Sequence, residues 1–239
     1  MTPMVLPDRP PYDLVAAEYY DTVRHPTCQN FGELSERFLR QRAEALASRE
    51  GWTLEIGAGR SVVAPALLAR GIGLDRLILL DRSRAMLEHS RRWQSLGAKL
   101  LVADAAASAI RSATISLVVA GLGDPYNDER LWMEVHRITI PGGTCLFTAP
   151  ALEWAERFRA SSDRSEAEFV LGDGTAIAVP SKVLSVEEQT RLVAAAGMRV
   201  VEVADYSSAE LISPHSKKLD VFDGAMHVPI IRGFAIRQS

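Results

Sequence analysis

The stretch Trp52–Arg60, WTLEIGAGR, decides the fold of this chain, because an apolar run leads there into Gly57-Ala58-Gly59. The next residues, 61–70, read as a helix. A strand that turns sharply into a helix needs residues that tolerate positive φ, and a ligand that approaches the turn needs bare backbone. Glycine meets both demands, so the stretch predicts a strand, a ligand-binding turn and a helix. An ordinary strand-to-helix turn is the alternative, since one Gly-x-Gly pair is weak evidence.

An acid at the end of the next apolar run favours a nucleoside ligand. Asp81 ends LILLD, where its carboxylate can accept hydrogen bonds from ribose hydroxyls. A dinucleotide fingerprint would carry a third glycine at the position of Val62, where it lets the helix pack close to a pyrophosphate. Glu55, just before the glycines, would repel phosphates and attract an amino group. The residues therefore point to S-adenosylmethionine, which is cationic at its sulfur and its amine.

Composition excludes several classes of protein. The chain has 239 residues, 47% of them hydrophobic, which suits one domain with additions. A net charge of −3 argues against nucleic acid or an anionic membrane as a partner. Cys28 and Cys145 lie far apart, so neither a disulfide framework nor a zinc site is indicated. The proline-rich N-terminus lacks a signal-peptide pattern and no run is long enough to span a membrane, so we expect a cytoplasmic protein.

The middle of the chain alternates short apolar runs with helical stretches, which is typical of a parallel sheet with crossover helices. Ser83 is expected to cap a helix to Leu96, and Asn127 or Asp128 to cap another to Ile138. Pro141-Gly142-Gly143 predicts a stop and turn before the fifth strand. The expected strands are 53–56, 76–80, 99–102, 115–120 and 144–148.

The flanking segments follow other patterns. Residues 1–11 carry four prolines and predict an extended arm, and they precede expected helices over 12–20 and 31–49. After Pro150 we expect a helix over 151–160, a hairpin over 168–179 around Gly172-Asp173-Gly174, and a capping box at Ser185 that opens a helix to Ala196. Residues 198–203 and 229–236 predict two last strands at the sheet edge, joined by a loop that contains His215 and His227.

Four stretches in order, LEIGAGR, DRSRAML, LVADAAA and IPGGTCLF, resemble motifs of the class I S-adenosylmethionine-dependent methyltransferases. The resemblance implies an α/β fold in three layers, a Rossmann-like seven-stranded, mostly parallel sheet with an antiparallel last strand. It also implies an N-terminal arm and helical lid over residues 1–50. The methyltransferase domain would then span 51–239, with an insertion at about 151–184 that contains the hairpin.

The resemblance also assigns the cofactor site residue by residue. Asp81 would bind the ribose hydroxyls, with Arg82 beside the adenine. Asp104 would accept a hydrogen bond from the adenine amino group, and the Ala105 amide would donate to a ring nitrogen. Asp104 has a simpler alternative as a helix cap, and Arg82 as a solvated side chain. The methionine half and the sulfur would be lined by Glu55, Gly57, Ala58, Gly59, Gly121 and Leu122, with Tyr19 of the lid beside them.

Candidate catalytic residues come from the lid and from the segment after the fourth strand. YYDTVRHPTCQNF brackets His25 with aromatic residues, and His25 and Tyr20 are the lid's candidates. Asp124-Pro125-Tyr126 resembles the Asp-Pro-Pro-Tyr of amino-group methyltransferases, which makes Asp124 and Tyr126 candidates, although a simple turn fits equally well. Cys28 has no visible partner as a nucleophile. No metal site is indicated, because no acidic cluster has ligand spacing.

Three functions remain open at this point. The first is methylation of a small molecule at oxygen or nitrogen, by a monomer or homodimer. The second is methylation of an amino group on a macromolecule, which Asp124-Pro125-Tyr126 favours. The third is a non-catalytic module that binds the cofactor. Net acidity and the aromatic lid favour the first, with a neutral or cationic acceptor.

Overall fold

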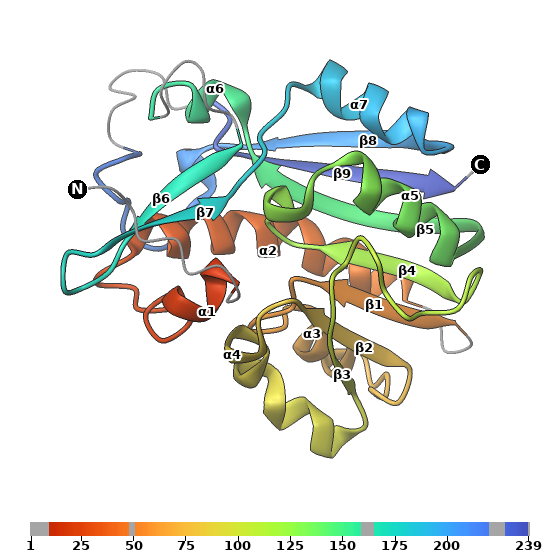
Figure 1. The fold of residues 1–239 in the computed structure, drawn as a ribbon. Coiled ribbons are helices and arrows are strands. Elements are labelled where there is room, and N and C mark those ends of the chain that lie inside the picture. The colour runs from red at the N-terminus through yellow and green to blue at the C-terminus, as the bar shows by residue number, and fades with distance from the viewer. Residues whose placement is uncertain (1–9, 48–50, 159–164, 220–227, 239) are drawn as a thin grey trace.

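One seven-stranded sheet forms the centre of the molecule (Figure 1). The structure is a computed structural model that describes residues 10–47, 51–158, 165–219 and 228–238. All neighbouring strands pair in parallel except the pairs made by the last strand, β9, which runs antiparallel to both of its neighbours. In sheet order the strands are β3 (Lys99–Val102), β2 (Leu77–Asp81), β1 (Trp52–Ile56), β4 (Ile115–Ala120), β5 (Thr139–Pro150), β9 (Ile231–Gln238) and β8 (Met198–Tyr206). The expected fold class is confirmed.

Helices cover both faces of this sheet and bury its central strands. One face carries α2 (Pro26–Leu46), α3 (Val63–Ala69), α4 (Arg84–Leu87) and the 3-10 helix η1 (Glu88–Leu96). The other face carries α5 (Glu129–Ile138) and α7 (Val186–Ala195). The remaining elements are α1 (Pro11–Val15), η2 (Asp124–Tyr126), α6 (Leu152–Ala155), β6 (Glu166–Val170), β7 (Ala176–Pro180) and η3 (Ser208–Glu210).

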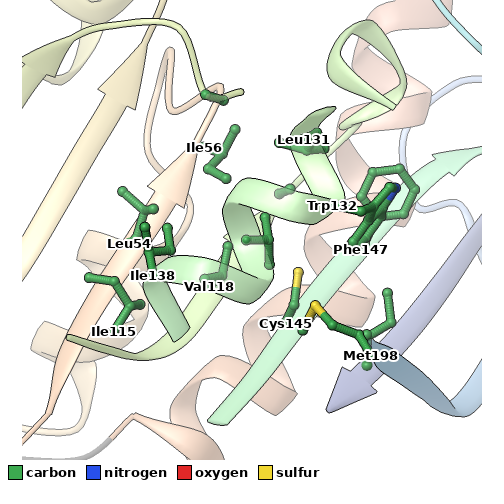
Figure 2. Packing of buried hydrophobic residues seen from close by; sticks show 14 of the residues in the cluster. Leu54, Ile56, Ile115, Val118, Leu131, Trp132, Ile138, Cys145, Phe147 and Met198 are labelled. Atoms are coloured by element: carbon green, nitrogen blue, oxygen red, sulfur yellow. The ribbon is translucent and has the colours of Figure 1, made fainter. Parts of the chain in front are cut away.

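Each face of the sheet has its own hydrophobic core, because successive side chains along a strand point to opposite faces. In β4, Leu117 and Val119 pack into the core under α2 and α3, whereas Val118 packs under α5 and α7. Figure 2 shows the second core, where the ring of Trp132 from α5 lies against Phe147 of β5, with centroids 5.2 Å apart. Central strands that are apolar on both faces are typical of a covered parallel sheet.

Several boundaries differ from the sequence expectations. The helix expected over 31–49 begins at Pro26, because a proline at the first helical position has the φ that a helix needs. The helix expected over 12–20 ends at Val15 and continues as turns. Ser83 caps its helix as predicted, through the Met86 N–H, but the helix becomes 3-10 from Glu88 on. The expected arm falls largely on residues 1–9, outside the described residues, as does His227.

The prediction of a stop at Pro141-Gly142-Gly143 is wrong, because β5 already begins at Thr139. The pairing with β4 shifts from Ile115↔Thr139 to Leu117↔Thr144, so extra residues of β5 bulge out of the ladder. Gly142 adopts φ 75° in this bulge. The Pro-Gly-Gly sequence therefore allows an interruption inside a strand instead of a turn before it.

The hairpin of β6 and β7 lies at the end of the sheet where the parallel strands finish, on the left in Figure 1, and α1 packs against it. The contact is a small apolar cluster that includes Val15, Phe169 and Val179. Loops at this end of a parallel sheet are the usual place for a ligand. None of the described helices combines the length and apolar character needed to cross a bilayer.

Candidate active site

A cavity of about 450 Å³ opens at the carboxyl ends of the central strands. This volume falls in the range of small-molecule sites, roughly 300–1,000 Å³. Its walls come from the turn after β1, the ends of β2 and β4, and the segment from α1 through α2. The lining includes Tyr12, Tyr19, Tyr20, His25, Cys28, Glu33, Ser35, Glu36, Leu39, Glu55, Gly57, Ala58, Arg60, Asp81, Met86, Gly121, Leu122 and Tyr126.

The turn after β1 needs glycine because its backbone adopts positive φ and two tyrosine side chains approach it closely. Gly57 and Gly59 have φ values of 62° and 35°, in the left-handed region. A Cβ on Gly59 would lie 2.3 Å from the Tyr20 hydroxyl oxygen, and one on Gly57 would lie 3.1 Å from the Tyr126 ring. Gly57 and Ala58 line the cavity, so this turn presents backbone to a ligand there.

Glu55 is a buried carboxyl on the wall of the cavity, with only 4% of its surface exposed. Its Oε1 accepts the Val62 N–H at 2.9 Å, and its Oε2 accepts the Ser61 hydroxyl. Burial raises the pKa of Glu55 to about 7 despite these hydrogen bonds. Glu55 thus holds the start of α3 and offers a carboxyl that a cationic ligand would ionise.

Asp81 ties the glycine turn to the end of β2. Its Oδ2 accepts the Gly59 N–H at 3.0 Å and its Oδ1 accepts the Ser83 N–H at 2.9 Å. The residue is 3% exposed, and burial raises its pKa to about 6. Asp81 lines the cavity, as a group that binds ribose hydroxyls must.

The end of β4 is held in an uncommon backbone conformation. Leu122 adopts φ 48°, which costs energy for a residue other than glycine. Its N–H donates to the Thr148 Oγ1 at 2.8 Å, and that hydroxyl lies 2.6 Å from the Ser35 Oγ of α2. Gly121 is needed beside it, since a Cβ there would lie 2.8 Å from Leu39. Gly121 and Leu122 both line the cavity.

The segment between α1 and α2 covers the cavity with aromatic rings. Tyr20 accepts the Arg60 N–H at 2.7 Å, and the Arg60 guanidinium lies 4.1 Å from the Tyr20 ring centroid. Tyr19 stacks on Phe169 of the hairpin with centroids 6.0 Å apart. The structure therefore brings Tyr19 and Tyr20 to the same cavity as Glu55 and Asp81.

His25 lies at the lid end of the cavity, with its ring centroid 4.1 Å from that of Phe169. Its side chain is only 10% exposed, and its Nε2 lies 3.6 Å from the Glu18 Oε2. The same Glu18 oxygen accepts the Gly172 N–H at 2.8 Å, which joins the lid to the hairpin. A buried imidazole beside a carboxylate is an arrangement that can accept a proton from a bound ligand.

Asp124 and Tyr126 diverge, although they are two residues apart. The Asp124 carboxylate accepts the Ser181 hydroxyl and is not part of the cavity lining. The Asp124 carbonyl accepts the Lys182 N–H at 2.8 Å, so this residue fastens η2 to the end of β7. Tyr126 instead crosses the glycine turn, and its hydroxyl accepts the Arg82 backbone N–H.

The remaining adenine-site candidates are not part of the cavity lining. Asp104 accepts the Ala106 N–H at 2.9 Å on its Oδ1, which is the capping alternative from the sequence. Its side chain is 37% exposed and lies 4.0 Å from Arg130. Ala105 is buried in the core beside α5, and Arg82 is exposed. The lining therefore contains the ribose candidate and every candidate for the methionine half except Gly59, and it lacks Arg82, Asp104 and Ala105.

Several residues of the site carry no signal of their own in the sequence. Glu18, Glu36 and Phe169 belong to the lid, α2 and the hairpin, and only tertiary packing brings them to one place. Cys28 also lines the cavity, where burial raises its thiol pKa to about 11, so the thiol is protonated at neutral pH. No group of three potential metal ligands occurs in the described part of the chain.

Comparison with known proteins places this geometry in context. Residues 54–147, about two fifths of the chain, match the family described as a methyltransferase domain. No curated protein matches the sequence.

Solved structures share the fold at low sequence identity. One is a putative methyltransferase from Haloferax volcanii, solved in complex with the Trm112 methyltransferase activator; it is 17% identical with a TM-score of 0.67, over 96% of this chain and 98% of that one. A putative S-adenosylmethionine-dependent methyltransferase from Listeria monocytogenes is 13% identical with a TM-score of 0.64, over 87% and 99%. The geranyl diphosphate C-methyltransferase of Streptomyces coelicolor, which was crystallised with S-adenosyl-L-homocysteine, is 14% identical with a TM-score of 0.62, over 85% and 77%.

Proposed function

We propose that this chain, which is a class I S-adenosylmethionine-dependent methyltransferase, methylates a small molecule in the cavity beneath its N-terminal lid. The family assignment rests on the matched methyltransferase domain and on the shared fold. The choice of a small acceptor rests on the cavity. One observation carries it: a single space reaches from Asp81 and Gly57 to His25 and Tyr19, which belong to the segment between α1 and α2.

The residues along this space fit the cofactor. Gly57 and Ala58 line the cavity at the turn after β1, and the Asp81 carboxyl lines it where ribose hydroxyls would be held. Glu55 and Glu36 would hold the amino group, and the Arg60 guanidinium lies on the same wall for the carboxylate. When bound, S-adenosylmethionine supplies a methyl group that is activated for transfer by its sulfonium.

The protein's own contribution is alignment, exclusion of water and placement of a base. Tyr19 and Tyr20 cover the cavity, and a covered site gains from proximity and from removal of solvent. His25 would accept the proton of an acceptor hydroxyl or ammonium at its imidazole, with Glu18 beside it to stabilise the imidazolium. Cys28 stays protonated and would only line the site.

The wall chemistry favours a neutral or cationic acceptor. Carboxyls of Glu33, Glu36, Glu55 and Asp81 and four tyrosines line the cavity, and cations are attracted both to carboxylates and to aromatic faces. Among the lining residues of the described chain, Arg60 is the one permanent cation. A diphosphate acceptor such as that of the Streptomyces enzyme would find little to neutralise its charge here.

Labelled methyl transfer tests the proposal. The purified chain is incubated with S-adenosylmethionine labelled in its methyl group and with a cell extract divided into small molecules, protein and nucleic acid. We expect label in the small-molecule fraction, and we expect His25→Gln to reduce its rate by about 100-fold or more. Label found in macromolecules alone would contradict the choice of acceptor.

A second candidate function is methylation of an amino group on a macromolecule. The Asp124-Pro125-Tyr126 sequence favours it, and the fold is shared with a putative methyltransferase that was solved in complex with an activator protein. However, the Asp124 carboxylate bonds to Ser181 and does not line the cavity, so it is poorly placed to hold a target nitrogen. The same labelling experiment separates this candidate, and a non-catalytic binding module would give no label in any fraction.

A further inference from the structure

The Tyr126 ring lies against the glycine turn, Gly57-Ala58-Gly59, near the ends of β1 and β2. A Cβ built on Gly57 would be 3.1 Å from the Tyr126 Cε2 and 3.7 Å from its hydroxyl oxygen. The hydroxyl accepts the backbone N–H of Arg82, the residue directly after β2. The charges of Asp81 and Asp104 both help to raise the pKa of this hydroxyl. Tyr126 therefore occupies the space between the glycine turn after β1 and Arg82 after β2.

That space is where the adenine base would belong if Arg82 and Asp104 recognise it. Asp81 and Tyr126 both line the cavity, whereas Asp104 is not part of the lining. A purine and a phenol ring are both flat aromatic groups of similar thickness, so they suit the same slot and cannot share it. Arg82 was expected beside the adenine, and Tyr126 already engages its backbone N–H.

The backbone on both sides of Tyr126 is firmly attached. Before it, the Gly123 N–H donates to the Thr148 carbonyl at 2.8 Å, and Asp124 is fastened to the end of β7. After it, the buried Asn127 amide donates to Gln189 at 2.8 Å and accepts the Trp132 ring N–H at 3.0 Å. A change at this place therefore falls to the Tyr126 side chain, which can rotate into the cavity that it lines.

We propose that Tyr126 is a displaceable side chain that competes with the adenine base for the slot between Arg82 and Asp104. This inference rests on the proposed function, since it assumes that the cofactor is an adenosyl compound. The base binds only when the ring of Tyr126 turns away. The apparent dissociation constant is then the intrinsic one divided by the fraction of molecules whose slot is open. Tyr126 would thus set cofactor affinity from a position that contributes no contact to the sulfonium end.

Calorimetric titration with S-adenosylhomocysteine tests the proposal in three proteins. Because Tyr126→Ala empties the slot, we expect it to bind about tenfold more tightly than the unmodified chain. Tyr126→Phe keeps the ring and loses only the hydrogen bond to Arg82, so we expect a gain of about two- to threefold. S-methylmethionine, a sulfonium without the base, should bind all three proteins equally.

The opposite outcomes overturn the proposal. If the Tyr126 ring stacks on the base, Tyr126→Ala will weaken S-adenosylhomocysteine binding, and if the ring lies elsewhere, affinity will not change. Asp104→Ala in the Tyr126→Ala background removes the acceptor for the adenine amino group and should weaken binding, because the base then reaches this position. No effect would contradict the shared slot. Failure of the unmodified chain and of Tyr126→Ala to bind at millimolar ligand would instead overturn the proposed function itself. A circular-dichroism melt of each variant confirms that it is folded.

Discussion

Cofactor binding should release protons, because two cavity carboxyls are partly protonated near neutral pH. Burial raises the pKa of Glu55 to about 7 and that of Asp81 to about 6. A bound ammonium beside Glu55 and ribose hydroxyls beside Asp81 both favour the ionised carboxylates. Binding therefore lowers both pKa values, and each carboxyl loses the proton that it carried.

The size of the effect follows from these two values. At pH 6.5 about three quarters of Glu55 and about a quarter of Asp81 are protonated, so binding releases about one proton. At pH 8 the same sum is about a tenth of a proton. Protons compete with the ligand as pH falls, so affinity should weaken by about 100-fold between pH 8 and pH 5.5.

Titration calorimetry with S-adenosylhomocysteine measures this release directly. At pH 6.5 the observed enthalpy should differ between two buffers by about the difference in their ionisation enthalpies, because about one proton is released. At pH 8 this difference should fall to about a tenth of that size. Glu55→Gln should remove about three quarters of it, which separates the protein's protons from those of the ligand. An enthalpy that is independent of the buffer at pH 6.5 would refute the placement of these carboxyls against the ligand.

Four substitutions test the fold around the site. The pKa of Glu55 is higher in the folded chain than in the unfolded chain, so folding takes up a proton and the free energy of unfolding falls as pH rises from about 4 to 7, by about 3 kcal/mol in full. Urea denaturation of Glu55→Gln should therefore show a flatter dependence of this free energy on pH. An unchanged slope would contradict the raised pKa. Gly233→Ala would place a Cβ 2.5 Å from the Phe38 ring and should destabilise the fold by about 1–3 kcal/mol. Gly32→Ala in α2 has open space around it and should stabilise the fold by about 0.5–1 kcal/mol. Equal effects would show that the Phe38 ring moves away from the new Cβ. Thr148→Val removes the hydroxyl that holds the left-handed residue after β4 and should cost about 1–3 kcal/mol in the same assay, while a neutral result would mean that this turn needs no support.

The central sheet could be predicted from the sequence because each of its strands is recognisable from the residues of that strand alone. Runs such as LILLD and ISLVVA are apolar on both faces and bounded by turn residues, and a strand buried on both sides needs nothing else. The capping box at Ser185 was equally local and is confirmed by hydrogen bonds in both directions with Glu188. The start of β5 was missed, because a bulge inside a strand and a turn before one use the same Pro-Gly-Gly residues.

The site could be predicted only where its residues follow strands. Glu55, Gly57, Asp81 and Gly121 reach one cavity because parallel strands end at one edge of the sheet. The contacts of the lid depend on residues far apart in the chain, and no local pattern indicates that Glu18 meets Gly172.

Side-chain direction was also out of reach of the sequence. In Asp124-Pro125-Tyr126 the acid turns toward Ser181 and the ring toward Arg82, and the order of residues does not encode that divergence. Which residues follow a strand is therefore readable from the sequence, and which way each one points requires the packed structure.

A crystal structure with S-adenosylhomocysteine tests the account most directly. We predict ribose hydroxyls on the Asp81 carboxylate, the amino group at Glu55, and the sulfur beside Gly121 with free space between it and His25. A ligand bound elsewhere, or a sulfur that faces away from the lid, would contradict the assignment of this cavity as the place of methyl transfer.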